Sequence, residues 1–262
     1  VMSIGRTFEE SLLKAIRSLE TGVFHLYMEK FDEKTREELL SYIKAGTDDR
    51  IFAVAQLLRL GCNVQQIAFE TKIDGFFLEK MKKIIEMENM LKANPWNRDV
   101  LHEAKRGGFS DRAVAWLWNT DEDTVFRIRK EMHLFPVYKM IDTCASEFDS
   151  YVPYFYSTYE EENESIAEDR KKILVLGSGP IRIGQGVELD YSTVHAVKTI
   201  RNAGYEAIVI NNNPETVSTD YTTSDKLYFE PLCVEDVMNV IELEWPDGVI
   251  ASLGGQLSLI HI

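Results

Sequence analysis

Apolar residues recur at helical spacing through the first 135 residues of the chain. In residues 6–22, Leu13 and Ile16 share one helical face, and Thr7 three residues before Glu10 forms a capping-box pattern at the start. The same period predicts helices over residues 34–45, 48–60, 63–70, 74–92, 99–105, 111–118 and 122–132. No strand is expected before about residue 170, so the pattern predicts an all-helical first region.

Two parts of this helical region resemble each other at an offset of 47 residues. The segment "GCNVQQIAFETKIDGFFLEKMKKI", which begins at Gly61, aligns with "GFSDRAVAWLWNTDEDTVFRIRKE", which begins at Gly108, and apolar positions match apolar positions. Each copy predicts a short helix, a tight turn and a longer helix. Because neither copy would cover its hydrophobic face alone, we expect the two copies to pack into one small bundle.

The same outline also fits a helix-turn-helix DNA reader, whose second helix would carry Arg127, Arg129 and Lys130. The whole chain is acidic, however, with 29 basic and 43 acidic residues and a formal net charge of −14. Such a charge repels the phosphate backbone of nucleic acids. A helical spacer or association module is therefore the favoured interpretation.

The helical period is lost between His133 and Lys172. Aromatic residues crowd residues 151–159, and an acidic run follows at residues 160–169. Exposing so many rings to water is unfavourable by about 25 cal/mol per Å², so we expect this segment to lie against its neighbours rather than to form a flexible linker. The acidic run is interpreted as a solvated turn rather than a metal site.

Strand and helix patterns alternate from Lys171 onward. Buried strands are expected in "KKILVLG", "YEAIVIN", "KLYFE" and "GVIASLGG", and helices at residues 187–203 and in "VEDVMNVIELEW". This alternation predicts a parallel, Rossmann-like sheet whose functional edge lies at the carboxyl ends of the strands. That edge would collect residues 177–186, 211–220 and 254–256.

The glycine-rich loop at this edge departs from the dinucleotide-binding fingerprint. After Gly177 and Gly179 the third glycine would be expected at position 182, which is Arg182, and no lone acidic residue ends the second strand. The GK[ST] sequence of a phosphate-binding loop is absent as well. The residues alone leave three interpretations open: a loop that lets the backbone approach another domain, an NAD site, or an unspecific turn.

The cysteines and the apolar runs indicate the cellular compartment of the protein. Cys62, Cys144 and Cys233 lie far apart without metal-ligand spacing, which is typical of packed thiols in a reducing compartment. No signal-peptide pattern opens the chain, and no run of about 18 apolar residues occurs. We therefore expect a cytoplasmic protein with neither a membrane partner nor a nucleic-acid partner.

Several long motifs resemble the large chain of carbamoyl phosphate synthase, in the order in which that family has them. "SIGRTFEESLLKAIRSLETG" resembles the end of the family's first half, and "PVYKMIDTCASEF" with "YSTYEEENE" resembles the segment before its second half. "GSGPIRIGQGVELDYS", "NNNPETVSTDYTTSDKLYFEP" and "GGQ" resemble the start of the second half. The resemblance runs from Val1 to Gln256; Leu189 replaces the family's usual phenylalanine, and "LSLIHI" at the end does not resemble the family.

The resemblance implies an α plus α/β fold: an all-helical oligomerisation domain followed by a truncated, Rossmann-like pre-ATP-grasp domain. The implied domains are the end of the first ATP-grasp unit at residues 1–22, the oligomerisation domain at 23–150, a connector at 151–170, the pre-ATP-grasp domain at 171–256 and a non-native tail at 257–262.

The family makes carbamoyl phosphate from bicarbonate, ammonia and two ATP for arginine and pyrimidine biosynthesis. The resemblance implies ATP, Mg²⁺ or Mn²⁺, and K⁺ as cofactors of the complete enzyme, while this chain would bind none of them and hold no catalytic residue or metal ligand. It would be inactive alone. Implied partners are a small amidotransferase chain, the remaining ATP-grasp domains of the same large chain, and further copies joined through the helical domain.

The resemblance also places the "IGQGVE" loop beside an interior passage for carbamate. Arg182, Gln185, Gly186 and Glu188 would line this passage or an interdomain surface, with the guanidinium of Arg182 facing a carboxylate. A structural alternative stays open, in which Arg182 pairs with a neighbouring acid and Glu188 caps the start of a helix.

Three functions are therefore compared: a piece of a ligase, a free-standing association or nucleotide-binding module, and a helix-turn-helix regulator fused to a sensor domain. The motifs favour the ligase.

Overall fold

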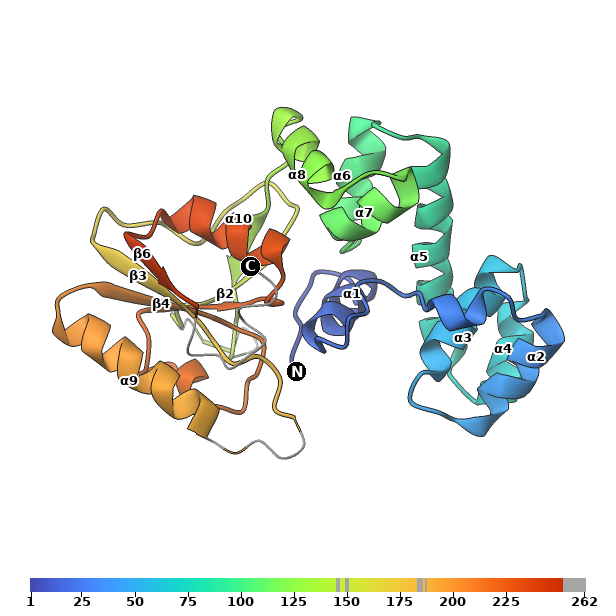
Figure 1. Ribbon diagram of the computed structural model, residues 1–262, viewed down its shortest axis with the longest axis horizontal. Helices are drawn as coiled ribbons and strands as arrows, with labels where there is room; N and C mark the ends of the chain where they lie inside the picture. The colour runs from blue at the N-terminus through green and yellow to red at the C-terminus, as the bar shows by residue number, and fades with distance from the viewer. Residues whose placement is uncertain (145–146, 149–150, 183–185, 187, 252–262) are drawn as a thin grey trace. The chain divides into compact units, whose positions relative to one another are not determined.

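The computed structural model describes residues 1–144, 147–148, 151–182, 186 and 188–251 (Figure 1). The chain forms two compact units. The helical unit comprises Thr7–Ile16 and Thr21–Met132, and the α/β unit comprises Val1–Arg6, Arg17–Glu20 and His133–Ile262. Helix α1 (Phe8–Ser18) contributes to both. The predicted α plus α/β fold class is confirmed.

The helical unit consists of short helices with polar caps. Its helices after α1 are α2 (Arg36–Tyr42), α3 (Arg50–Arg59), α4 (Val64–Thr71), α5 (Gly75–Ala93), α6 (Arg98–Arg106), α7 (Asp111–Trp118) and α8 (Glu122–Glu131). Side chains of Asn63, Asp74, Ser110 and Asp121 each accept a hydrogen bond from a backbone N–H in the first turn of the following helix. Such caps satisfy N–H groups that have no partner within the helix.

The predicted internal repeat is confirmed and is longer than the sequence indicated. Helices α4 and α7 have the same length at an offset of 47 residues, and both end on a left-handed residue, Lys72 and Asn119. Helices α3 and α6 end at Arg59 and Arg106, at the same offset, so each copy has three helices. We call α3–α4–α5 the first repeat and α6–α7–α8 the second repeat.

Equivalent positions of the two repeats fill the core of the helical unit. Three such pairs have no exposed surface: Leu57 with Ala104, Ile67 with Val114, and Leu78 with Val125. The helical period therefore buries the same stripe in both copies, as expected for a repeat.

The α/β unit contains one sheet with the strand order β1-β2-β5-β4-β3-β6. Its strands are β1 (Val137–Met140), β2 (Tyr154–Thr158), β3 (Lys172–Leu176), β4 (Glu206–Asn211), β5 (Lys226–Phe229) and β6 (Gly248–Ile250). The pair β1–β2 is antiparallel, and the other pairs are parallel. The parallel core matches the prediction, and one antiparallel edge is added to it.

The expectation that no strand precedes about residue 170 is wrong. Strands β1 and β2 lie within residues 133–170 and belong to the same sheet as the later strands. Tyr138 and Phe155 are buried against Tyr228, with ring centroids 5.0 and 5.7 Å from that of Tyr228. Both strands are too short for a period to stand out, and their pairing depends on β5, far along the chain. The aromatic segment packs as predicted, but as part of the sheet.

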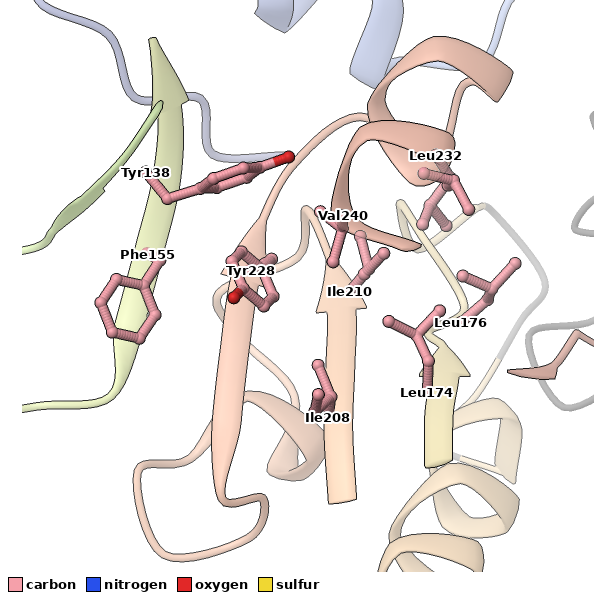
Figure 2. Close-up of a cluster of buried hydrophobic side chains, with 10 residues drawn as sticks. Tyr138, Phe155, Leu174, Leu176, Ile208, Ile210, Tyr228, Leu232 and Val240 are labelled. Atoms are coloured by element: carbon pink, nitrogen blue, oxygen red, sulfur yellow. The ribbon is translucent and has the colours of Figure 1, made fainter. Parts of the chain in front are cut away.

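Helices cover both faces of the sheet. Figure 1 shows α9 (Glu188–Asn202) and α10 (Val234–Glu244) on opposite sides of it. Leu174, Ile208 and Tyr228 point to the side of α10, where Val240 packs on them (Figure 2). The intervening residues of the strands pack with Val197 of α9. This alternation follows from the two-residue period of a strand that is buried on both faces.

Candidate functional site

Two loops meet at the carboxyl ends of β3 and β4. One follows β3 and begins at Gly177, and the other comprises residues 211–220 after β4. Leu176 pairs with Ile210 in register, so the loops leave the sheet side by side. The sequence predicted this edge as the functional one. Its third predicted part, residues 254–256, lies outside the described residues.

Gly177 makes room for a side chain of the neighbouring strand. A Cβ atom at Gly177 would lie 2.5 Å from Cγ of Asn211, which is fully buried. The Asn211 Oδ1 atom accepts a hydrogen bond of 3.2 Å from the N–H of Gly179, and its Nδ2 donates to Ser218 Oγ at 3.4 Å. Asn211 thus ties the two loops together, and the first glycine of the motif is needed for this contact.

Gly179 serves a second close approach. It has a φ of +68°, and a Cβ atom there would lie 2.5 Å from the carboxylate of Glu20. Glu20 accepts a hydrogen bond of 2.8 Å from Nη2 of Arg182. Because a carboxylate occupies the space beside Gly179, the residues present do not fit a phosphate cradle at this turn.

The segment that carries Glu20 is attached to the same edge. Asn212 donates from Nδ2 to the carbonyl of Ser18 at 3.3 Å, and its own carbonyl accepts from the N–H of Met2 at 2.9 Å. Glu20 itself has a left-handed φ of 51°. These contacts bring an acid from near the start of the chain to Arg182, 162 residues away in sequence.

A cavity of about 320 Å³ lies beside the two loops and the start of α9. Gly186 and Glu215 line it, one from each loop, and its apolar lining residues include Pro180, Ile181, Val194 and Val217. The cavity is large enough to admit a small molecule with its water.

Asp190 is an acidic wall of this cavity that the sequence analysis missed. Its side chain is 6% exposed, and its Oδ2 accepts a hydrogen bond of 2.8 Å from the N–H of Ser218. Its Oδ1 is buried and has no hydrogen-bond partner among the described residues. Such an oxygen favours a donor in the cavity. The sequence signal that could have identified Asp190 is an acidic residue within the apolar stripe of the helix, four residues before Val194.

The four residues predicted for the passage occupy different places. Arg182 contacts Glu20, and its side chain is 35% exposed. Gly186 lines the cavity. Glu188 is the first residue of α9, and Gln185 lies outside the described residues. The pairing of Arg182 with an acid is the contact that the structural alternative named; the role of all four in a passage stays a prediction.

A second polar cluster lies at the opposite, amino-terminal edge of the sheet. Nζ of Lys172 and Nζ of Lys226 contact Glu244 at 3.1 and 2.8 Å, and Glu206 lies 4.0 Å from Lys226. Burial raises the pKa of Glu206. Burial alone would raise the pKa of Glu244 too, but hydrogen bonds from Lys226 and Tyr228 lower it. With all these side chains buried and their charges matched, the cluster holds the strand ends together.

One of the three basic residues that the helix-turn-helix interpretation assigned to DNA binding is buried. Arg129 has no exposed surface, and its guanidinium makes two-point contact with the carboxylate of Asp111 at 3.0 to 3.1 Å. A buried, paired arginine is not available to a phosphate backbone.

Within the described part of the chain, no group of three or more His, Cys, Asp or Glu side chains is placed to hold a metal ion. Among the same residues, none of the helices has the length and apolar character that crossing a membrane requires.

Two family models match the chain. One, described as carbamoyl-phosphate synthetase large chain, oligomerisation domain, matches residues 1–133. The other, described as carbamoyl phosphate synthase preATP-grasp domain, matches residues 169–261. The first match covers the helices through α8, and the second covers the parallel strands β3 to β6 with the loops of the site. The second also includes residues 257–261 of the tail that was predicted to be non-native.

Proposed function

The chain belongs to the carbamoyl-phosphate synthetase large chain family, and from this premise we propose that it forms the middle of a glutamine-dependent carbamoyl phosphate synthase. The family is one of ligases. The complete enzyme would join bicarbonate, ammonia and two ATP into carbamoyl phosphate for arginine and pyrimidine biosynthesis. The order of the two matched domains, helical and then α/β, supports this position in the large chain.

We further propose that the carboxyl edge of the sheet borders the path of carbamate. The observation that carries this proposal is the ion pair of Glu20 with Arg182, which lies next in sequence to Pro180 and Ile181 of the cavity lining. A carbamate anion would attract the planar guanidinium, which binds carboxylates at two points. Because Glu20 already occupies part of that guanidinium, the anion would be held weakly and would leave again.

Other parts of the large chain would supply the chemistry. The complete enzyme would use ATP with Mg²⁺ or Mn²⁺ and K⁺ in its ATP-grasp domains, and a small amidotransferase chain would deliver ammonia from glutamine. The side chains of Asn211 and Glu20 fill the turn at Gly177–Gly179, which supports a role for this turn other than nucleotide binding. We therefore infer that this chain contributes association surfaces and part of the path, works in the cytoplasm, and is inactive alone.

The passage is tested in a large chain that contains this segment, assayed with its glutaminase partner. Arg182→Leu removes the guanidinium, and Arg170→Leu, at an exposed arginine that pairs with Glu168, is the matched control. We expect Arg182→Leu to lower carbamoyl phosphate synthesis by about tenfold or more, while bicarbonate-dependent ATP hydrolysis and ATP formation from carbamoyl phosphate both persist. Equal loss of all three activities, or no loss, would contradict a passage role.

A further inference from the structure

The carboxylate of Asp190, in the first turn of α9, is a buried negative charge without a cation beside it. Asp190 is 6% exposed, and the hydrogen bond that its Oδ2 accepts comes from the uncharged N–H of Ser218. Among the described residues its Oδ1 accepts no hydrogen bond, and no basic side chain pairs with the carboxylate. The end of α9 offsets only part of the charge, because a helix dipole is equivalent to about half an elementary charge.

Two other buried carboxylates show how this chain compensates such charges. Asp111 contacts Arg129 at 3.0 Å, and Glu244 contacts Lys226 at 2.8 Å. Burial of a charge is unfavourable unless an opposite charge or further hydrogen bonds offset it. Asp190 differs from both in its position, because it forms part of the wall of a cavity. A ligand in that cavity can supply the cation that the chain itself does not place there.

The walls of the cavity are suited to an organic ligand. Its volume of about 320 Å³ lies within the range of small-molecule sites, about 300–1,000 Å³. Pro180, Ile181, Val194 and Val217 line it with apolar surface. Contact with these side chains stabilises an alkyl group, because it removes apolar surface from water. A hydrated metal ion would gain nothing from such walls.

The remaining side chains of the lining also favour a positive charge. Lys198 and Glu215 lie exposed at the rim with opposite signs, which leaves Asp190 as the uncompensated charge. Tyr191 lines the cavity as well, and its ring lies 4.2 Å from the ring of His195. The face of a tyrosine ring attracts cations that come within about 6 Å of its centre.

We propose that this cavity binds a small organic ammonium ion. The ammonium group compensates the carboxylate of Asp190, and the alkyl group contacts the apolar walls. Carbamate is an anion, which the same carboxylate would repel, and Arg182, which the proposed function assigns to carbamate, pairs with Glu20 instead. The ammonium site is therefore separate from the path of carbamate and does not rest on the proposed function.

The test measures binding of n-butylammonium to the full 262-residue chain by isothermal titration calorimetry, with n-butanol as the uncharged probe of the same chain length. We expect n-butylammonium to bind about tenfold or more tightly than n-butanol, because only the ammonium group compensates a charge. Asp190→Asn keeps the shape of the side chain and an acceptor for the N–H of Ser218. It should abolish the preference for n-butylammonium and leave the binding of n-butanol unchanged.

Two further variants locate the site. Asp220→Asn is the matched control, at an exposed acid of the neighbouring loop outside the cavity lining, and it should keep the preference of the wild type. Val217→Trp, at a lining residue that is 56% exposed, puts a large ring into the cavity and should weaken the binding of both probes. Circular dichroism should show the helix content of the wild type in all three variants.

Several outcomes would overturn the inference. These are equal binding of the two probes to the wild type, no binding of n-butylammonium, and a preference that persists in Asp190→Asn. If Asp190→Asn does not fold, unchanged binding to Val217→Trp contradicts the site by itself. Displacement of n-butylammonium by an equal concentration of K⁺ would identify a metal-ion site and overturn the organic class of ligand. None of these results affects the passage role of Arg182, which is tested by enzyme activity.

Discussion

The first and second repeats share a backbone but stabilise it with different chemistry. Two apolar residues and one exposed lysine of the first repeat correspond to three buried charged residues of the second. The pairs are Leu58 with Lys105, Val64 with Asp111 and Lys82 with Arg129. The two repeats therefore differ in charge at three equivalent positions and still have the same fold. The glycines, the helix caps and the buried apolar stripe, which both repeats share, maintain that fold.

Each repeat has one buried carboxylate, and the two lie in different places. Asp111 in the second repeat contacts Lys105 and Arg129. In the first repeat, Glu88 contacts Arg59 at 2.6 Å and His25 at 2.9 Å. Glu88 lies in the part of α5 that extends past the end of α8, so the longer helix created this site. Buried charges are tolerated in both copies because each is paired.

The largest effect is expected from Asp111→Val, which installs the residue type of the first repeat. It leaves Lys105 and Arg129 buried without their shared carboxylate, so the free energy of unfolding of the helical unit should fall by about 3–5 kcal/mol. Urea unfolding followed by tryptophan fluorescence measures it, because Trp96, Trp116 and Trp118 lie in this unit.

The triple variant Lys105→Leu/Asp111→Val/Arg129→Met sharpens this first comparison. It removes the two buried cations that Asp111 pairs with as well, so it should be more stable than Asp111→Val by about 2 kcal/mol. Equal instability of the two variants would show that apolar packing cannot replace the ionic cluster in the second repeat.

The pH dependence of stability tests the carboxylate of the first repeat. Burial alone would raise the pKa of Glu88, but hydrogen bonds from Arg59 and His25 lower it to about 2 from the ordinary 4.5. Because the folded-state pKa is depressed, the stabilisation is present above about pH 4.5 and is lost as the pH falls towards 2. Its size is about 3 kcal/mol.

Glu88→Gln should reduce the loss of unfolding free energy between pH 4.5 and pH 2. The control Glu86→Gln, at an exposed glutamate of the same helix that pairs with Lys82, should leave that loss unchanged. The measurement is urea unfolding at a series of pH values. If the unfolding free energy of Glu88→Gln falls as steeply with decreasing pH as that of the wild type, Glu88 does not contribute to the acid sensitivity.

The smallest difference between the two repeats is expected at the equivalent glycines that follow α3 and α6, where Gly61→Ala gives the weakest single effect. Both have positive φ, so an alanine at either position costs about 1–2 kcal/mol in backbone strain. A Cβ atom at Gly61 meets nothing within 4 Å, whereas one at Gly108 would lie 2.6 Å from Cα of Glu10. Gly108→Ala should therefore destabilise the helical unit by about 1–3 kcal/mol more than Gly61→Ala, as measured by urea unfolding. Equal losses would show that α1 yields at this contact.

Much of the fold was predictable because it depends on local patterns. The helices of both repeats, the offset between them and the alternating elements after Lys171 follow from periodicity and caps. Strands β1 and β2 were missed because four or five residues carry too little period, and their burial depends on contact with Tyr228. The equivalence of α3 and α6 was missed because the apolar Leu58 corresponds to the charged Lys105, so the apolar patterns of the two helices differ there.

The site was predictable in its location and less so in its contacts. Gly177, Gly179 and Arg182 were found from the motif, and the strand ends placed them at one edge. Asp190 was hidden in a helical pattern, and the partner of Arg182 is Glu20, which no spacing in the sequence connects to it.

The sequence by itself determined most of the helices and strands, the offset of the internal repeat and the family, because these depend on residues close in the chain or on motifs in order. Only the tertiary structure decided that the glycines after β3 admit Asn211 and Glu20, and that one repeat buries an ionic cluster where the other buries apolar residues. Such contacts join residues from 6 to 162 positions apart in the sequence, and their energies depend on burial, which the local sequence pattern does not show.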